Sequence, residues 1–423
     1  MNRIIFALGV CTASDAIEVL LINSLSSSPT FQATFNREST EFSDTSSFTF
    51  FGMFLGGLTA SLLNARIGLR NLLLASLSVT FVLSLLTNLA SDIALYNYIR
   101  FIIGISIGST IPPTFTLAAL HSEAEERGRN NTLVAWFWMV GSIYISVAAY
   151  CMFEFSDANW RIFNVTCSLP SGFAIFLVYN YVGEPKGTKG GEIGLLDHVK
   201  SMRNLYNNVE QRRRTLLLQL CWFTLSFSTF SLLSVITPLF SEVGIESEYL
   251  STVIFSSAAL AGNVGSYLCI DNVERRKLLG VSVVCASLSA FLFAFFANET
   301  NSSKAWVIVF AACLFQISDT AAWNVVDIVS SEQFIERRSK ATGFGICSAT
   351  GRLGAFAAQF VNGGLIDGGV TKLLIIDGVV LLICGIGAVG LDERCSFLDE
   401  DEGEDDDEAE EHSEHKTLMD FIE

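Results

Sequence analysis

Apolar stretches, each near the length of a membrane-spanning helix, recur along the whole chain, and this pattern constrains the fold more than any other feature. A helix needs about 20 apolar residues to cross the hydrocarbon core of a bilayer. Hydrophobic residues make up 51% of the chain and charged residues only 16%, which is typical of membrane proteins. The sequence therefore predicts an all-α integral membrane protein with twelve transmembrane helices, at residues 3–25, 45–63, 71–89, 96–120, 132–153, 160–182, 215–239, 249–270, 278–297, 304–330, 341–365 and 371–391.

Basic residues are distributed unequally between the loops that join these spans. With the N-terminus in the cytosol, twenty of the 26 Lys and Arg residues lie on the cytosolic side and only four on the opposite side, with Arg100 and Arg352 inside spans. The positive-inside rule then places both termini in the cytosol, at the plasma membrane or an endomembrane. Tandem N-glycosylation acceptors at Asn298 and Asn301 fall in a loop on the opposite side, which agrees with this orientation.

A polar break at residues 183–214 separates the first six spans from the last six. A short motif repeats across it at a constant offset of 206 residues, as Gly56 with residues 65–70 and Gly262 with residues 271–276. The sequence thus predicts two pseudo-symmetric six-helix bundles, at residues 1–182 and 215–391, joined by a cytosolic loop at 183–214. Residues 392–423 carry sixteen acidic and two basic residues, which predicts a disordered, acidic cytosolic tail.

Five short motifs occur in a characteristic order: Arg100-Phe-Ile-Ile-Gly-Ile-Ser-Ile-Gly108, Arg127-Gly-Arg129, Trp138-Met-Val-Gly-Ser-Ile-Tyr144, Trp160-Arg161 and Ala341-Thr-Gly-Phe-Gly-Ile-Cys-Ser-Ala-Thr-Gly-Arg-Leu-Gly354. In order and spacing they resemble the major facilitator superfamily, and within it the branch of synaptic-vesicle-glycoprotein-related and organic-ion transporters. This resemblance implies the major facilitator fold and a secondary transporter that moves a small solute by alternating access. We expect it to act as a monomer in the lipid bilayer.

The loop between the second and third spans departs from the family pattern, which reads like Gly-x-x-x-Asp-Arg-x-Gly-Arg-Arg. Here Ala65 replaces the Asp and Leu69 replaces one Arg, and the second copy of the loop has Glu274 where Gly is usual. The resemblance implies that these loops gate the cytosolic side, through Arg66, Gly68 and Arg70 in the first copy and Asp271, Arg275 and Arg276 in the second. The departures leave open an alternative, a non-transporting receptor or vesicle protein built on a transporter scaffold.

Two carboxylates, Asp15 and Glu18, lie near the middle of the first span. Their three-residue spacing puts them on one face of a helix, and charged residues inside spans face a protein interior or a water-filled path. A carboxyl group in a low-dielectric setting beside a like charge holds a proton readily, so the pair is predicted to couple transport to protons. The alternative is a buried ion pair with Arg100 or Arg352 that only holds helices together. Both interpretations require the first span to be an anchor rather than a cleaved signal peptide, as its continuous apolar run indicates.

Arg352 lies near the membrane midplane, and its planar guanidinium suits a carboxylate or phosphate. It is therefore predicted to bind an anionic solute, with a helix-packing counterion as the alternative. Arg100 is a second candidate ligand, for which the packing role is favoured.

Polar residues on the tenth span form a stripe at four-residue spacing. Asp319, Trp323 and Asn324 are predicted to line the solute cavity. Asp327 either continues the stripe or pairs with basic residues of the following loop. Aromatic residues such as Trp222 and Phe230 either floor a pocket or simply pack.

Other classes of function lack support in the sequence. Nine of the ten cysteines lie within apolar stretches, which predicts that they are small buried residues. The sequence contains no spacing typical of a metal site, a nucleophile elbow or a phosphate loop. The chain is therefore predicted to be no enzyme, to need no cofactor or metal, and to bind no nucleic acid. The predicted function is secondary active, proton-coupled symport of a small anionic organic solute.

Overall fold

Twelve long helices make up the computed structural model, which describes residues 2–123, 126–156, 158–184, 203, 205–270, 273–297, 305–332, 337–365 and 370–391. They confirm the twelve predicted spans. Their bounds are α1 (Arg3–Ser26), α3 (Ser43–Ile67), α4 (Leu69–Leu86), α5 (Ile93–Leu120), α6 (Arg127–Ala149), α7 (Trp160–Tyr181), α9 (Val209–Leu233), α11 (Glu248–Cys269), α12 (Arg275–Ala297), α13 (Ala305–Glu332), α14 (Arg337–Leu365) and α15 (Val370–Val389). Short helical segments join them: α2 (Pro29–Phe35), η1 (Ser39–Phe42), η2 (Thr87–Leu89), η4 (Tyr150–Glu154) and α10 (Ile236–Glu242).

Ten of the twelve long helices are apolar enough, over eighteen residues, to cross a membrane by length and composition. The two that fall short of that threshold are α3 and α14. Both are rich in glycine and hydroxyl residues, and they pack against each other between the two halves of the molecule rather than only facing lipid. Their lower hydropathy therefore reflects burial in protein.

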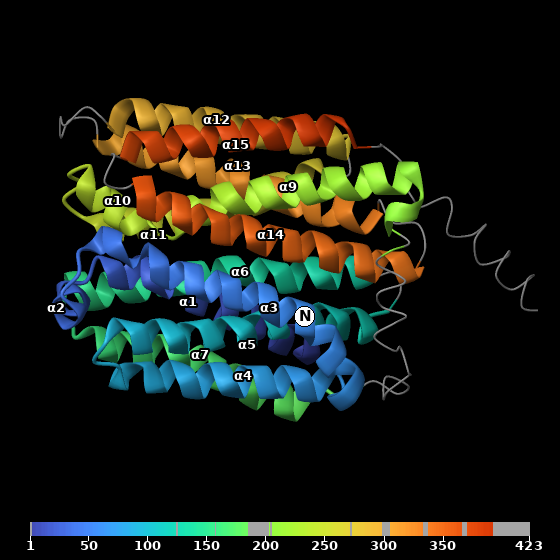
Figure 1. Ribbon diagram of the computed structural model, residues 1–423, viewed down its shortest axis with the longest axis horizontal. Coiled ribbons are helices and arrows are strands. Elements are labelled where there is room, and N and C mark those ends of the chain that lie inside the picture. The colour runs from blue at the N-terminus through green and yellow to red at the C-terminus, as the bar shows by residue number, and fades with distance from the viewer. Residues whose placement is uncertain are drawn as a thin grey trace, which may run out of the picture.

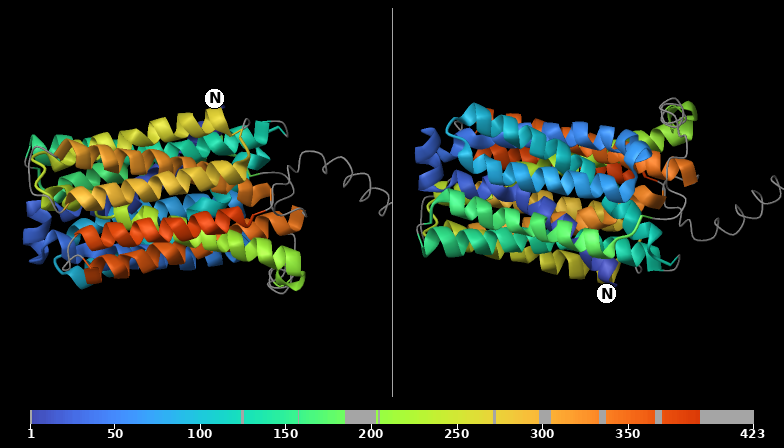
Figure 2. Two further views of the ribbon diagram at one scale, coloured as in Figure 1. Left: turned by 90° about the horizontal axis from the view of Figure 1, so that it is seen from above. Right: turned by 90° about the horizontal axis from the view of Figure 1, so that it is seen from below.

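The long helices lie side by side in two groups, which Figure 1 shows one above the other. Helices α1 and α3 to α7 pack among themselves, as do α9 and α11 to α15. The groups, here called the N-terminal and C-terminal halves, meet mainly where α3 packs on α14 and where α6 packs on α11. The two further views in Figure 2 show the long helices running roughly parallel to one another along the bundle. One end, here called the basic end, carries the α3–α4 loop and the start of α6; the other, the distal end, carries α2 and α10 (Figure 1).

The predicted seventh span, 215–239, is interrupted in the structure. Helix α9 ends at Leu233, Val235 adopts a non-helical backbone at φ −132° and ψ 8°, and α10 begins at Ile236. Pro238 explains the break, because its ring would clash with the carbonyl of Ser234 in a continuous helix and it has no N–H to donate. The break places Pro238 in the first turn of α10, where proline is tolerated.

The repeated motif found in the sequence has a structural counterpart in two close helix crossings. Gly56 on α3 faces the carbonyl oxygen of Ile105 on α5, with no room for a Cβ atom. Gly262 on α11 faces the carbonyl oxygen of Ile317 on α13 in the same way. Small residues let membrane helices approach this closely, so the two halves use equivalent glycines for equivalent contacts.

Several predictions concern residues outside the described ranges. These are the glycosylation acceptors Asn298 and Asn301, the second-loop residue Asp271, most of the central loop and the acidic tail from residue 392. They remain predictions.

Candidate functional site

Glu18 and Arg100 form an ion pair inside the N-terminal half. Arg100 Nη1 on α5 donates to Glu18 Oε2 on α1 at 3.0 Å, and both side chains are fully buried. Ser84 on α4 donates to the other carboxylate oxygen at 2.6 Å. Arg100 also lies over the ring of Tyr96, 5.6 Å from its centroid. Both Glu18 oxygens are therefore engaged by neighbours, as the ion-pair interpretation of the sequence expected for this residue.

Asp15 lies one turn away on α1 in a different environment. It is only 2% exposed, and its Oδ1 has no hydrogen-bond partner among the residues that the structure describes. The charge of Arg352 attracts this carboxylate and that of Glu18 repels it. An isolated buried carboxylate is costly, so Asp15 depends on Arg352, on a bound group or on a proton for its stability.

Arg352 lies near the middle of α14, in the opposite half of the molecule from Asp15. Two carboxylates attract it, Asp15 on α1 and Asp327 on α13. It takes part in none of the salt bridges within the described chain, and it is partly exposed. Its guanidinium lies over the ring of Phe230, 5.9 Å from the centroid. The N–H groups of the Arg352 guanidinium, which lies against Phe230, are thus accessible to a ligand.

Aromatic rings lie on the distal side of Arg352 and form what we call the aromatic floor, Phe50, Trp138 and Phe230. The ring of Phe230 on α9 packs on Phe50 of α3 at 4.9 Å and against the edge of Trp138 of α6 at 6.3 Å. Residues of both halves therefore meet at this level, and Phe50 and Phe230 belong to the distal parts of α3 and α9.

The tenth-span stripe on α13 points in more than one direction. Asp319 is 2% exposed and accepts a hydrogen bond from Thr229 Oγ1 at 2.7 Å; Trp323 Nε1 donates to the same hydroxyl at 2.8 Å. Asn324 donates to Asn263 Oδ1 at 2.8 Å and to Ser266 at 2.7 Å, which ties α13 to α11. The charge of Arg352 acts on the carboxylate of Asp327, whereas Asp319 is linked to the partly exposed Trp323 through the Thr229 hydroxyl.

Hydrogen bonds between the two halves close the distal end. Asn23 Oδ1 on α1 accepts from the backbone N–H of Thr237 on α10 at 3.0 Å. The carbonyl oxygen of Ser24 accepts from the Tyr249 hydroxyl at 3.5 Å. Ser247 donates to Glu154 Oε1 of η4 at 2.6 Å. These bonds and the aromatic floor seal the interface on that side.

The first predicted gating loop is held to the end of α7. Glu184 accepts from the backbone N–H groups of Leu69 and Arg70, both at 3.0 Å, and so caps the N-terminus of α4. The Arg70 side chain donates to the carbonyl oxygens of Val182 at 2.6 Å and Tyr179 at 3.0 Å. Gly68 makes the turn between α3 and α4 at φ +85°, a conformation that side-chain-bearing residues rarely adopt.

Other members of the predicted gating loops lie at the same end. Arg66, in the last turn of α3, is exposed to solvent. Arg275 and Arg276 begin α12, where Arg276 Nη1 donates to the carbonyl oxygen of Leu391 at 3.5 Å.

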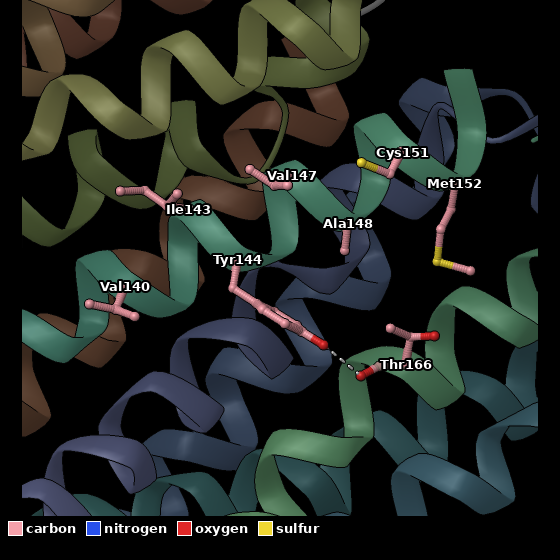
Figure 3. Close-up of a pocket in the computed structure, with 8 residues that line it drawn as sticks. All are labelled: Val140, Ile143, Tyr144, Val147, Ala148, Cys151, Met152 and Thr166. Carbon is pink, nitrogen blue, oxygen red and sulfur yellow. Dashed lines mark hydrogen bonds between the residues drawn. The ribbon is translucent and has the colours of Figure 1, made fainter. Parts of the chain in front are cut away.

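A separate apolar groove of about 530 Å³ lies on the surface between α6 and α7 (Figure 3). Val140, Ile143, Val147 and Ala148 of α6 line it, and the Tyr144 hydroxyl across it donates to the carbonyl oxygen of Thr166 at 3.2 Å. Several of these side chains are exposed on the outer surface of the helices. None of the predicted site residues borders this groove, so it is distinct from the site around Arg352.

Among the residues considered from the sequence, the structure brings Arg352 near Asp15, Asp327 and Phe230. It adds Phe50 and Trp138 of the aromatic floor. Sequence reasoning overlooked Asp377, a carboxylate within the last span, and Glu184, which caps α4. An acidic residue in an apolar run was itself a signal for Asp377. Nothing in the sequence indicated that Glu184 would reach a loop more than a hundred residues away.

Comparisons with known proteins agree on one family. A family model described as "Major Facilitator Superfamily" matches residues 8–358. The niacin transporter NiaP of Acinetobacter baylyi (strain ATCC 33305 / BD413 / ADP1) is 24% identical over 342 residues, which cover 74% of this chain and 75% of that protein. Synaptic vesicle glycoprotein 2A of Rattus norvegicus is 26% identical over 181 residues, which cover 40% of this chain and 24% of that protein. A D-xylose–proton symporter of known structure shares the fold, with a TM-score of 0.73 at 14% identity over 92% of this chain and 95% of that one.

Proposed function

Because the chain belongs to the Major Facilitator Superfamily of multi-pass membrane transporters, we propose that it moves a small organic anion across the membrane together with a proton. In this proposal Arg352 binds the anionic group of the solute, and Asp15 takes up and releases the proton. The family carries small solutes rather than catalysing reactions, so no enzymatic activity is invoked.

The observation that carries the proposal is the opposition of Asp15 and Arg352 from the two halves. Each is ionisable, each lies near the middle of its helix, and neither has a salt-bridge partner among the described residues. An anion that binds Arg352 weakens the attraction between Arg352 and Asp15, so Asp15 then accepts a proton more readily. Solute and proton therefore favour each other's binding, which is what symport requires.

The relatives support the class of solute and the class of ion. Niacin, which names the related transporter, is a pyridine carboxylic acid and therefore an anion at neutral pH. The structural neighbour is named for proton symport. A small aromatic carboxylate also suits a site in which an arginine lies over aromatic rings.

Closure of the distal end gives the direction from which the site is reached. The aromatic floor and the hydrogen bonds to Asn23 and Ser24 separate Arg352 from that end. We propose that the solute enters and leaves from the basic end in this state, and that an opposite state opens the distal end.

Purified protein in liposomes tests the proposal. With an imposed pH gradient, nicotinate and related monocarboxylates should accumulate in wild-type vesicles. Asp15→Asn should abolish accumulation but retain exchange of labelled for unlabelled solute. Arg352→Gln should weaken solute binding by about 10–100-fold, the loss expected for a charge-assisted hydrogen bond. Arg352→Lys should restore only part of it, because a lysine lacks the planar fork.

Asp44→Asn is the matched control, since Asp44 is a half-exposed carboxylate at the distal start of α3 that pairs with Arg37 at 2.9 Å. It should transport like wild type. Undiminished gradient-driven accumulation in Asp15→Asn would remove Asp15 from the proton step. Unchanged solute affinity in Arg352→Gln would remove Arg352 from the binding site.

A further inference from the structure

Asp377 lies within α15, two turns from the distal end of that helix, and is 1% exposed. Neither of its carboxylate oxygens has a hydrogen-bond partner among the described residues. The backbone around it is firmly placed: Ser228 on α9 donates to the carbonyl oxygen of Asp377 at 3.3 Å, and Ser287 on α12 to that of Gly378 at 2.7 Å. Packing therefore forces this side chain into the interior of the C-terminal half.

Oxygen-bearing side chains surround Asp377. The Ser231 hydroxyl lies near enough to favour the Asp377 carboxylate, although outside hydrogen-bond geometry, and the carboxylate of Asp319 repels it. Ser231 also donates to Asn362 Oδ1 of α14 at 2.9 Å, and Asp319 accepts from Thr229 at 2.7 Å. Two carboxylates from α13 and α15 thus share one buried polar cluster with hydroxyl and amide groups of α9 and α14.

Basic side chains are remote from this cluster in the described part of the chain. The helices packed on α15 are α9, α12 and α14. Charged residues of the first two lie in their first turns at the basic end, namely Glu210, Arg212, Arg213, Arg214, Arg275, Arg276 and Lys277. On α14, Arg352 acts on Asp15 and Asp327 instead, and Lys372 of α15 itself is exposed. An unpaired carboxylate in such a place is costly, so something must neutralise it.

We infer that the Asp319–Asp377 cluster is a binding site for one monovalent cation, a proton or a sodium ion, separate from the solute site at Arg352. Asp377 is its principal ligand, and Asp319, Ser231 and Asn362 supply further oxygen atoms. Intramembrane carboxylates of this kind mark ion pathways.

The cluster connects to the solute site through hydrogen bonds. Thr229 joins Asp319 to the indole of Trp323, which is partly exposed beside the aromatic floor. Occupancy of the cation site therefore changes the charge felt by Thr229 and the position of Trp323. This inference goes beyond the proposed function, and its test needs no transport.

Purified protein in detergent provides the test, with dicyclohexylcarbodiimide as a probe. This apolar reagent adds to a protonated carboxyl group, which loses no atom and becomes an N-acylurea that mass spectrometry locates. Wild-type protein should be labelled at Asp377 in mildly acidic buffer, and labelling should fall when the pH rises or when sodium chloride replaces choline chloride. Protection by pH alone identifies the proton as the ion; protection by sodium at constant pH identifies sodium.

Melting temperature gives a second readout. A proton bound only by the folded protein makes wild type less stable as pH rises, and bound sodium raises its melting temperature. Asp377→Asn, which is isosteric and uncharged, should lose both dependences, whereas the half-exposed control Asp44→Asn should keep them. Absence of labelling at Asp377 at every pH, or wild type and Asp377→Asn responding identically to pH and sodium, would overturn the inference. If Asp377→Asn does not fold, labelling of wild type decides alone.

Discussion

Two arginines lie inside the bundle, and their surroundings give them opposite roles. Arg100 is fully buried, pairs with Glu18 and reaches Tyr96. Arg352 is partly exposed and is shared between two carboxylates without a close pair. A close, fully buried ion pair favours helix packing, whereas a partly exposed charge without a close ion pair favours ligand binding. The sequence alone placed both in spans but could not separate these cases, because the difference depends on which side chains the tertiary fold brings near.

Substitution of one partner tests the packing role of the Glu18–Arg100 pair. Glu18→Gln should lower the free energy of unfolding by about 3–5 kcal/mol, because it leaves the Arg100 charge buried without a counterion. Thermal unfolding in detergent measures the change.

The double variant Glu18→Gln, Arg100→Met should recover part of the loss, since it removes both charges. Asp44→Asn serves as the control near the surface, where loss of a half-exposed pair should cost about 0–1 kcal/mol. A melting temperature that is the same for wild type and Glu18→Gln would refute the packing role.

Individual residues were predicted with uneven success. Asp15, Glu18, Arg100 and Arg352 stood out because charges are rare in apolar runs, and the structure brings all of them into the bundle core. Which carboxylate pairs with which arginine depends on helix rotation and packing, so the sequence left both options open. The solute and proton roles given to them remain predictions.

At the scale of elements, the lengths of the apolar runs placed all twelve helices, and the family model confirms the predicted family resemblance. Boundaries were less certain where polar residues extend a helix beyond the membrane. Helix α9 begins at Val209, within the stretch predicted as loop, because Asn208 accepts a hydrogen bond from Glu210 N–H and caps it. The break before α10 depended on one proline inside an otherwise uninterrupted apolar run.

The α3–α4 loop gives a test at this scale. Glu184→Ala should destabilise the start of α4 by about 0.5–2 kcal/mol, the usual value of a helix cap, because two N–H groups lose their acceptor. Hydrogen–deuterium exchange of residues 66–72 should become faster.

Glu126→Ala is the matched control at the same end, since Glu126 is exposed and only approaches Arg129 at 4.0 Å. Exchange in the α3–α4 loop should be unaffected by it. If Glu184→Ala leaves exchange in that loop unchanged, Glu184 does not hold the loop.

For the whole molecule, the central feature is an interface between two similar halves that is closed at one end. Its distal contacts are short polar side chains and aromatic rings rather than charged pairs. Hydrogen bonds of this kind exchange readily for bonds to water, each with a modest net effect of about 0.5–1.5 kcal/mol. A few such contacts are suited to a closure that must open again.

Asn23→Ala tests that closure. It removes the acceptor for Thr237 N–H, and a shift of about 1–2 kcal/mol would change the population of the distally open state by roughly 5–30-fold. Ser46, which is 5% exposed near the distal start of α3, can report it as Ser46→Cys. Labelling of that cysteine by a polar maleimide should speed up in the Asn23→Ala background.

Asn180→Ala controls for a general loss of structure, because the Asn180 amide bonds within its own helix near the basic end. It should not change labelling at position 46. Equal labelling rates in the Asn23→Ala and parent backgrounds would show that Asn23 does not hold the distal end shut.

The opposition of Asp15 and Arg352 also has an electrical consequence. In the proposed cycle, one monovalent anion and one proton enter the site together, so the loaded carrier has the same net charge as the empty one. Moving one uncompensated elementary charge across a membrane potential of 100 mV changes its free energy by about 2.3 kcal/mol. Because the anion and the proton cross together, this electrical work is absent in both directions. The membrane voltage then does no work on this pair of ions, and the accumulation that the pair supports follows the pH difference, about tenfold per pH unit.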